Sequence, residues 1–217
     1  MAPFTVLHVC MGNICRSPMA ERLLARAVRD RLTAPAATHA GGASVPAGAR
    51  DAAAFADTLV RSHSAGTGGW HAGEEMNPPA ARQVRARGGS VDGFTARKLR
   101  GDHIDAADLV LTATADQYDY VVALRPAAAR RTFVLGEFGR LLTGIDQKGL
   151  PPAELTVEAV HSRGTAIVRA VDERRAGEPA LPTDDLDDPW GRGDQTFTRI
   201  GDEVEDTIVP FAALLLP

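Results

Sequence analysis

The stretch Val9–Leu24, VCMGNICRSPMAERLL, joins an apolar run to a helical pattern through one short loop. The preceding residues 4–9, FTVLHV, are apolar and β-branched and predict a buried strand. Beyond the loop, Ser17 can cap a helix, Pro18 suits its first position, and Glu21 falls in its first turn. Apolar side chains recur there at helical spacing, namely Ala20, Leu23, Leu24, Ala27 and Val28. The stretch therefore predicts a strand–loop–helix unit.

Three further apolar runs predict strands, and helical patterns separate them. The runs are residues 58–64 (TLVRSHS), 108–112 (DLVLT) and 131–135 (RTFVL). Helices are predicted at 78–87, from the third strand to about Leu124, and near the C-terminal end, where Pro210 would end or kink the helix. Strands alternating with helices favour an α/β fold. We expect an open, doubly wound, four-stranded parallel sheet with helices on both faces and a phosphate-binding loop after the first strand.

Length and composition favour a single domain over residues 1–217, with insertions at about 33–57 and 140–180. Residues 33–57 are rich in Ala, Gly and Pro, which predicts a loop with one helical turn near residues 51–56. Residues 140–180 contain a helical period that Thr156 could cap, although Gly164 argues against one continuous helix. The sequence leaves the role of both insertions and the oligomeric state open.

The composition excludes several classes of protein. A formal net charge of −4 gives no general attraction to nucleic acid. Two cysteines cannot form a disulfide scaffold, and without clustered histidines they cannot complete a zinc site. No apolar run approaches the ~20 residues that a membrane span needs. The first residues, MAPFTVLHV, lack the pattern of a signal peptide, so a cytoplasmic location is expected.

The loop itself predicts an anion site. Backbone N–H groups between a strand and a helix start point at a bound anion, and the helix dipole adds positive charge. Arg16 offers a planar fork for two phosphate oxygens, and Cys10 beside it should be largely thiolate at neutral pH. A thiolate facing a bound phosphate is a nucleophile. His8, inside the strand, is predicted to be packed or hydrogen-bonded rather than catalytic.

The string C-M-G-N-I-C-R-S-P, residues 10–18, carries the Cys-x5-Arg-Ser signature of cysteine-dependent phosphatases and closely resembles the active loop of the low-molecular-weight protein tyrosine phosphatases. The resemblance implies that Cys10 is the nucleophile and that Arg16 holds the phosphoryl oxygens. It implies that Asn13 adopts a left-handed turn and that Ser17 hydrogen-bonds the thiolate. The other loop residues would contact substrate, namely Met11, Gly12, Ile14 and Cys15. No metal or cofactor is implied.

A general acid is also needed to protonate the leaving oxygen. In the resembled family it is the aspartate of an Asp-Pro-aromatic motif, which corresponds here to Asp188, followed by Pro189 and Trp190. The proline restricts the backbone at Asp188 and helps to aim its carboxylate. Asp187 is the nearest rival. The remaining aspartates of this acidic stretch are interpreted, together with Asp187, as solvated loop residues: Asp184, Asp185 and Asp194.

The segment Ser64–Pro78, SAGTGGWHAGEEMNP, resembles the second loop of the family. The resemblance implies that Ser64 hydrogen-bonds Asn13 and that Trp70 and Trp190 flank the substrate ring. His71 could contact substrate or lie exposed. The family often has His-x-Ala-Arg before the third strand, where this chain has Phe94-Thr95-Ala96-Arg97. Support for Asn13 is therefore expected to be thinner, or to come from Thr95 or another group.

These features predict a phosphatase acting through a cysteinyl-phosphate, on a phosphotyrosine protein or a small phosphorylated substrate. A protein-arginine phosphatase is one alternative, although those relatives have threonine in place of Ile14. An arsenate reductase typically needs cysteines downstream of Cys15, and this chain has none there. An idle phosphate-binding module would be expected to have lost Cys10, Arg16 or the Asp-Pro pair, and all are present. We also hypothesise that Cys15 protects an oxidised Cys10 by forming a disulfide with it.

Overall fold

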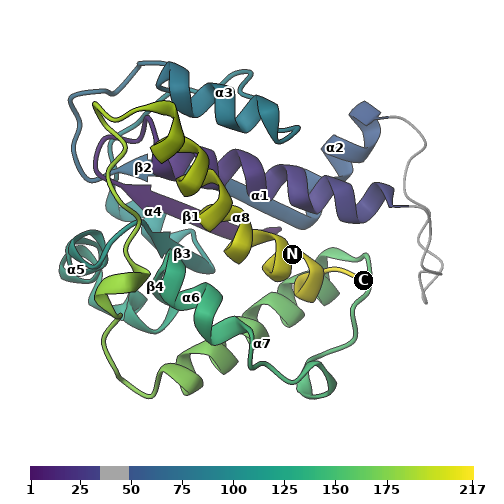
Figure 1. The fold of residues 1–217 in the computed structure, drawn as a ribbon. Coiled ribbons are helices and arrows are strands. Elements are labelled where there is room, and N and C mark those ends of the chain that lie inside the picture. Colours follow the sequence, from purple (N-terminus) through teal and green to yellow (C-terminus); the bar gives the residue numbers. More distant parts are fainter. Residues whose placement is uncertain (35–48) are drawn as a thin grey trace.

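The computed structural model describes residues 1–34 and 49–217. A four-stranded parallel sheet with the order β2-β1-β3-β4 forms the centre of the molecule (Figure 1). Its strands are β1 (Phe4–Cys10), β2 (Val60–Gly66), β3 (Leu109–Thr112) and β4 (Thr132–Val134). All four lie within two residues of their predicted ranges. The predicted α/β fold class is therefore confirmed.

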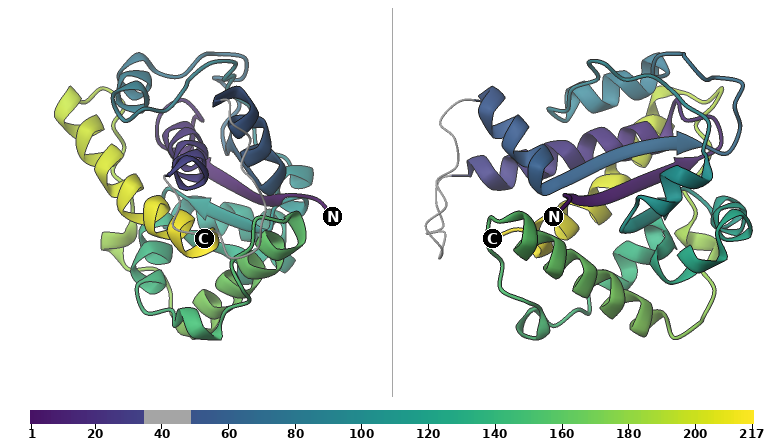
Figure 2. Two further views of the ribbon diagram at one scale, coloured as in Figure 1. Left: turned by 90° about the vertical axis from the view of Figure 1, so that its right-hand side faces the viewer. Right: turned by 180° about the vertical axis from the view of Figure 1, so that it is seen from behind.

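Helices cover both faces of this sheet (Figure 2). They are α1 (Arg16–Thr33), α2 (Ala49–Leu59), α3 (Pro78–Ala86), α4 (Gly101–Asp105), α5 (Ala115–Leu124), α6 (Leu135–Leu142), α7 (Val157–Arg175) and α8 (Asp194–Leu215). Short 3-10 turns occupy Pro126–Arg131, Gln147–Gly149 and Pro182–Asp184. Alternate side chains of β1 divide between two cores. Phe4 and Val6 pack with α1, α6, α7 and α8, whereas Leu7 and Val9 pack with α4 and α5.

The start of α1 differs from the prediction. The helix begins at Arg16 with Cys15 in the cap position, and Ser17 does not cap it. The hydroxyl of Ser17 instead lies 3.0 Å from the sulfur of Cys10. Glu21 also lies beyond the first turn and is buried. Ser17 bonds Cys10 and Asn13 rather than the helix end, and Glu21 accepts a hydrogen bond from Ser64 in β2.

The first insertion falls partly outside the described residues, because the loop predicted within 33–57 includes 35–48. Its predicted helical turn is part of the longer helix α2. Ala52, Ala56 and Leu59 lie on one side of α2 and are each at most 3% exposed. Burial of this face extends the helix beyond a single turn, since packing rather than propensity supplies most helical stability.

Two further helix predictions concern a glycine and a proline. Gly164 does not interrupt α7, because its missing side chain makes room for Phe4, whose ring carbons would lie 2.5 Å from an added Cβ. Pro210 does not end α8, which continues to Leu215 as its buried side chains pack on the core. The Thr156 cap is confirmed. No helix within 1–34 and 49–217 is both long and apolar enough to cross a membrane.

Candidate active site

A cavity of about 140 Å³ lies over the loop that follows β1. Three segments far apart in the sequence meet there: this loop, the loop after β2 and the loop before α8. The lining residues are Cys10, Met11, Gly12, Ile14, Cys15, Arg16, Trp70, His71, Asp188 and Trp190. Asn13, Ser17 and Ser64 do not line the cavity, and each is buried. The structure thus brings most of the predicted site residues to one cavity and places these three outside its lining.

The sulfur of Cys10 is surrounded by hydrogen-bond donors. The backbone N–H of Asn13 points at it over 3.3 Å, and the hydroxyl oxygen of Ser17 lies 3.0 Å away. Only 2% of Cys10 is exposed. Donors fixed around a sulfur stabilise its thiolate form, which is the form that reacts as a nucleophile.

Asn13 orders this arrangement from a left-handed backbone conformation with φ of 56°. Its amide nitrogen donates to Ser17 Oγ over 3.0 Å and to Ser64 Oγ over 2.8 Å, while its Oδ1 accepts the N–H of Arg97 over 2.9 Å. The amide orientation is therefore determined on both sides. Because Ser17 already accepts from Asn13, its own proton is free to point at Cys10.

Phe94 stands where the family often has a histidine that supports the loop asparagine, and here a backbone N–H group gives that support. Phe94 is a buried core residue, and the N–H of Arg97 takes over the support of Asn13. Ser64 donates in turn to Glu21 Oε2 over 2.6 Å. Burial raises the pKa of Glu21, and the hydrogen bond from Ser64 partly opposes that shift. Sequence reasoning missed Glu21 here because its chain position indicates only a helix residue.

Arg16 is buried, with 4% of its surface exposed. Nη1 donates to the carbonyl of Leu186 over 3.0 Å, and Nη2 lies 3.1 Å from the carboxylate of Asp188. Its Nε is buried and has no acceptor among the described residues. An orphaned N–H on a buried cation calls for an acceptor, and an oxyanion in the adjoining cavity would satisfy it.

Among the acidic residues before α8, only Asp188 lines the cavity. Its side chain is half exposed, and Oδ1 accepts the N–H of Trp190 over 3.1 Å. Its rival Asp187 forms an ion pair with Arg199 outside the cavity. The interpretation of Asp184 as a solvated residue is wrong, because it is 5% exposed and paired with Arg140 over 2.7 Å.

Two exposed tryptophans form the rim of the cavity. Trp70 is 65% exposed and Trp190 is 59% exposed, although both are large apolar side chains. His71 lies between them, with ring centres 6.3 Å from Trp70 and 5.5 Å from Trp190. The ring of Trp70 lies over Gly68, where an added Cβ would clash with it. The rim can therefore receive an aromatic ring, since exposed aromatic groups favour binding surfaces.

Cys15 differs from Cys10 although both are buried and free. Burial raises the pKa of Cys15 to about 12, with the nearby Cys10 adding to the effect. Cys15 is therefore a neutral thiol at neutral pH. Among the residues that the structure describes, no group of three or more His, Cys, Asp or Glu side chains could hold a metal ion.

The fold and this loop define a class: a parallel α/β protein with a cysteine–arginine anion loop at the end of its central strand. The family model "Low molecular weight phosphotyrosine protein phosphatase" matches residues 5–62 and 52–146. The chain belongs to this family and is a hydrolase of phosphoric monoesters.

Two relatives illustrate the range of similarity. The low molecular weight protein-tyrosine-phosphatase of Streptomyces coelicolor is 28% identical over 186 residues, which is 82% of this chain and 99% of the relative. Low molecular weight protein-tyrosine phosphatase A of Mycobacterium bovis is 36% identical over 128 residues, which is 59% of this chain and 63% of the relative. The first alignment extends over nearly the whole of the bacterial enzyme.

Solved structures of lower identity share the fold. The tyrosine phosphatase Wzb from Escherichia coli K30 superimposes with a TM-score of 0.59 at 18% identity, covering 97% of this chain and 96% of Wzb. The YwlE arginine phosphatase from Geobacillus stearothermophilus gives a TM-score of 0.58 at 23% identity, covering 97% and 92%. At these identities the likeness concerns the fold alone.

Proposed function

We propose that this phosphatase hydrolyses phosphotyrosine in proteins through a cysteinyl-phosphate formed on Cys10. One observation carries the proposal: the sulfur of Cys10 and the buried guanidinium of Arg16, with its orphaned Nε, line the same small cavity. A phosphate bound there meets a nucleophile and a fixed positive charge together. Preorganised charge of this kind supplies a large part of enzymatic rate enhancement.

The reaction has two steps. The thiolate of Cys10 attacks phosphorus, the bond from phosphorus to the leaving oxygen breaks, and Asp188 gives that oxygen a proton. Water then attacks the cysteinyl-phosphate, Asp188 takes the proton, and phosphate leaves as the thiolate is restored. Arg16 and the loop N–H groups stabilise the charge that spreads over the phosphoryl oxygens in both steps.

The walls of the cavity support an aromatic substrate. Trp70 and Trp190 stand at the rim, and Ile14 adds an apolar side chain within. A phenyl ring between them would bury apolar surface on both faces, which a serine phosphate cannot do. The partner is then a phosphotyrosine protein or a small aryl phosphate.

The proposal extends to the whole chain and its surroundings. Residues 1–217 form one phosphatase domain, to which the insertions at 33–57 and 140–180 are additions. Cys10 must stay reduced to react, so the enzyme works in a reducing compartment such as the cytoplasm.

The experiment compares kcat/KM for three peptides of one sequence that carry phosphotyrosine, phosphoserine or phosphoarginine. Phosphotyrosine should exceed phosphoserine by well over tenfold, which corresponds to about 1.4 kcal/mol. Trp190→Ala should reduce this preference, whereas Tyr120→Ala, an exposed aromatic outside the cavity, should not. A preference for phosphoarginine would overturn the tyrosine assignment and leave the cysteine chemistry standing.

A further inference from the structure

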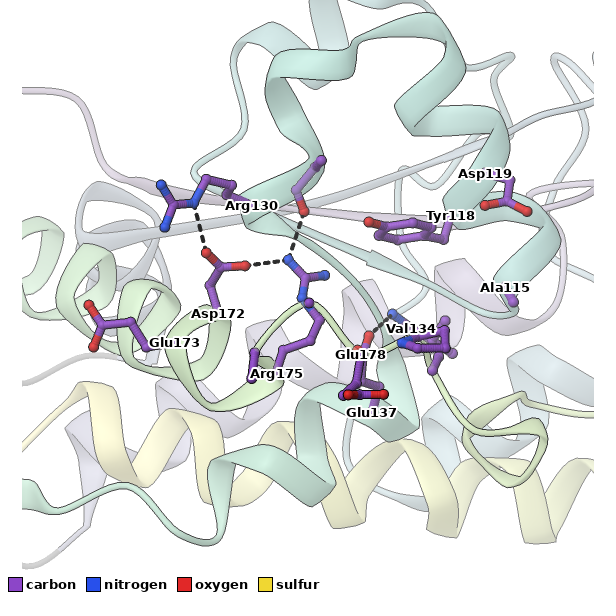
Figure 3. A pocket seen from close by; sticks show the side chains of 15 residues that line it. Ala115, Tyr118, Asp119, Arg130, Val134, Glu137, Asp172, Glu173, Arg175 and Glu178 are labelled. Carbon is purple, nitrogen blue, oxygen red and sulfur yellow. Dashed lines mark hydrogen bonds and ion pairs between the residues drawn. The ribbon is translucent and has the colours of Figure 1, made fainter.

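A second and larger cavity, of about 720 Å³, opens beside β4 at the edge of the sheet opposite β2 (Figure 3). Its walls come from α5, the end of β4, the start of α6, the end of α7 and the turn at 176–180. It shares no lining residue with the catalytic cavity. Helix α7 and the turn after it lie beyond residue 146, where the match to the family ends. The volume falls in the range of small-molecule sites.

The two arginines of this cavity share one carboxylate. Arg130 Nε lies 2.9 Å from the carboxylate of Asp172, and Arg175 bonds the same carboxylate. Arg175 also donates to the carbonyl of Thr132 over 2.8 Å (Figure 3 shows the ion pairs of both arginines with Asp172). Both arginines point at Asp172 and lie beyond ion-pair distance of the other carboxylates that line the cavity.

A buried carboxyl group in the wall has no such partner. Glu137 is 2% exposed, and its Oε2 accepts the N–H of Val134 over 3.2 Å. Among the residues that the structure describes, nothing else donates to this carboxyl and no basic group pairs with it. Burial raises the pKa of Glu137, and the positive charges of Arg175 and Arg140 only partly oppose that shift. Two more carboxylates of the wall, Glu178 and Asp119, are exposed and likewise without a basic partner in the described parts of the chain.

An aromatic ring completes the lining. Tyr118 lines the cavity from α5, and the guanidinium of Arg175 already lies 6.0 Å from the centre of its ring. The negative face of an aromatic ring attracts cations, guanidinium above all. The cavity therefore combines a cation-attracting ring with a buried carboxyl and an acidic rim.

We propose that this cavity binds an organic cation with a guanidinium group. The planar fork of guanidinium gives two parallel hydrogen bonds to one carboxylate, so Glu137 receives the head group. Tyr118 packs against it, and Glu178 and Asp119 add charge at the entrance. The cation is either a small guanidino compound or an arginine side chain of another protein.

The test is calorimetric titration of the full chain with agmatine and with its neutral analogue, in which a urea group replaces guanidinium. Agmatine should bind at least tenfold more tightly than the analogue, and added salt should weaken its binding. Glu137→Gln keeps an acceptor for the N–H of Val134 and removes the charge, so the affinity should fall at least tenfold. Glu178→Gln, an exposed change that does not threaten folding, should weaken binding severalfold. Glu158→Gln, an exposed position at the start of α7, is the matched control and should bind as the wild type does.

Two peptides distinguish the two sources of the cation: one carries a single arginine, and the other has citrulline at the same position. Agmatine binding supports a small compound. Binding of the arginine peptide without agmatine or citrulline-peptide binding supports a protein side chain. The proposal is overturned when neither guanidinium probe binds at about 10 mM, or when Glu137→Gln and Glu178→Gln both bind as tightly as the wild type. Turnover of an aryl phosphate, measured on every variant, reports that the chain is folded.

Discussion

The loop after β1 and the loop before α8 both reach the catalytic cavity, yet they are built in opposite ways. In the first loop and the helix start that follows it, Asn13, Arg16 and Ser17 are each at most 4% exposed. Asn13 and Arg16 are bonded to other segments, and Ser17 is bonded to Cys10 and Asn13. In the second, the side chain of Asp188 is half exposed and Trp190 is 59% exposed. These side chains of the first loop are buried, whereas those of the second loop are exposed.

The hydrogen bonds that hold the second loop to the rest of the fold involve residues that precede Asp188. Asp185 accepts the N–H of Ala115 over 2.9 Å, and the N–H of Leu186 donates to the carbonyl of Ala113 over 2.8 Å. Beyond Leu186, the contacts of Asp188 are with Arg16 and Trp190. The difference teaches that changes in the buried loop should affect chemistry and stability together, whereas changes in the exposed loop should affect chemistry alone.

The largest expected effect comes from the buried loop. Cys10→Ser should abolish hydrolysis of an aryl phosphate, because a serine hydroxyl is a far weaker nucleophile than a thiolate. Vanadate or phosphate should still bind, because Arg16 and the loop N–H groups remain. Steady-state turnover and calorimetric vanadate binding measure both, and wild-type activity should survive EDTA. Turnover near the wild-type level would remove Cys10 as the nucleophile.

The exposed loop should lose chemistry without losing stability. Asp188→Ala should slow substrates with poor leaving groups by about 10²–10⁴-fold, and those with good leaving groups far less. Urea unfolding should change by no more than about 1 kcal/mol, the usual contribution of an ion pair with an exposed partner, because Arg16 keeps its hydrogen bond to Leu186. Asp187→Ala is the matched control, since its side chain pairs with Arg199 away from the cavity. If Asp187→Ala shows this kinetic pattern and Asp188→Ala does not, the general acid is Asp187.

Oxidation should distinguish the roles of the two cysteines of the buried loop. Peroxide converts the thiolate of Cys10 to a sulfenic acid, which condenses with the thiol of Cys15 to give a disulfide and water. Wild type should then lose two titratable thiols and recover most of its activity with dithiothreitol. Cys15→Ser should remain largely inactive after the same treatment. Equal recovery in both proteins would assign Cys15 to packing alone.

The smallest expected effect is the pH dependence of stability from Glu21. Burial raises its pKa above the ordinary value of 4.5, so between 4.5 and the raised value the folded state holds more protons than the unfolded state. The stabilising contribution is therefore complete below pH 4.5 and is lost as pH rises through the folded pKa. Relative to Glu21→Gln, the wild-type free energy of unfolding should fall with a slope of at most about 1.4 kcal/mol per pH unit. Parallel curves from urea titrations would contradict this.

Local sequence predicted the elements well. Continuous apolar and β-branched runs located the strands, and a period of 3.6 residues located several of the helices, because these patterns are set by neighbours along the chain. The anion loop could also be predicted from the sequence, since the five residues between Cys10 and Arg16 form one continuous turn. Asp188 could be proposed because Pro189 marks its backbone. Ser17 was misassigned as a cap because the sequence does not show that its hydroxyl faces Cys10.

What the sequence by itself determined is this continuous unit: a strand, a loop with a cysteine and an arginine, and a helix. Only the tertiary structure decided what supports the unit. Glu21 and Ser64 are 43 residues apart, Asn13 and Arg97 are 84 apart, and Arg16 and Leu186 are 170 apart. The larger cavity likewise exists only where α5, α6 and α7 meet beside β4. Periodicity states which face of an element is buried, but the strand order and the packing of the helices state which residues it meets there.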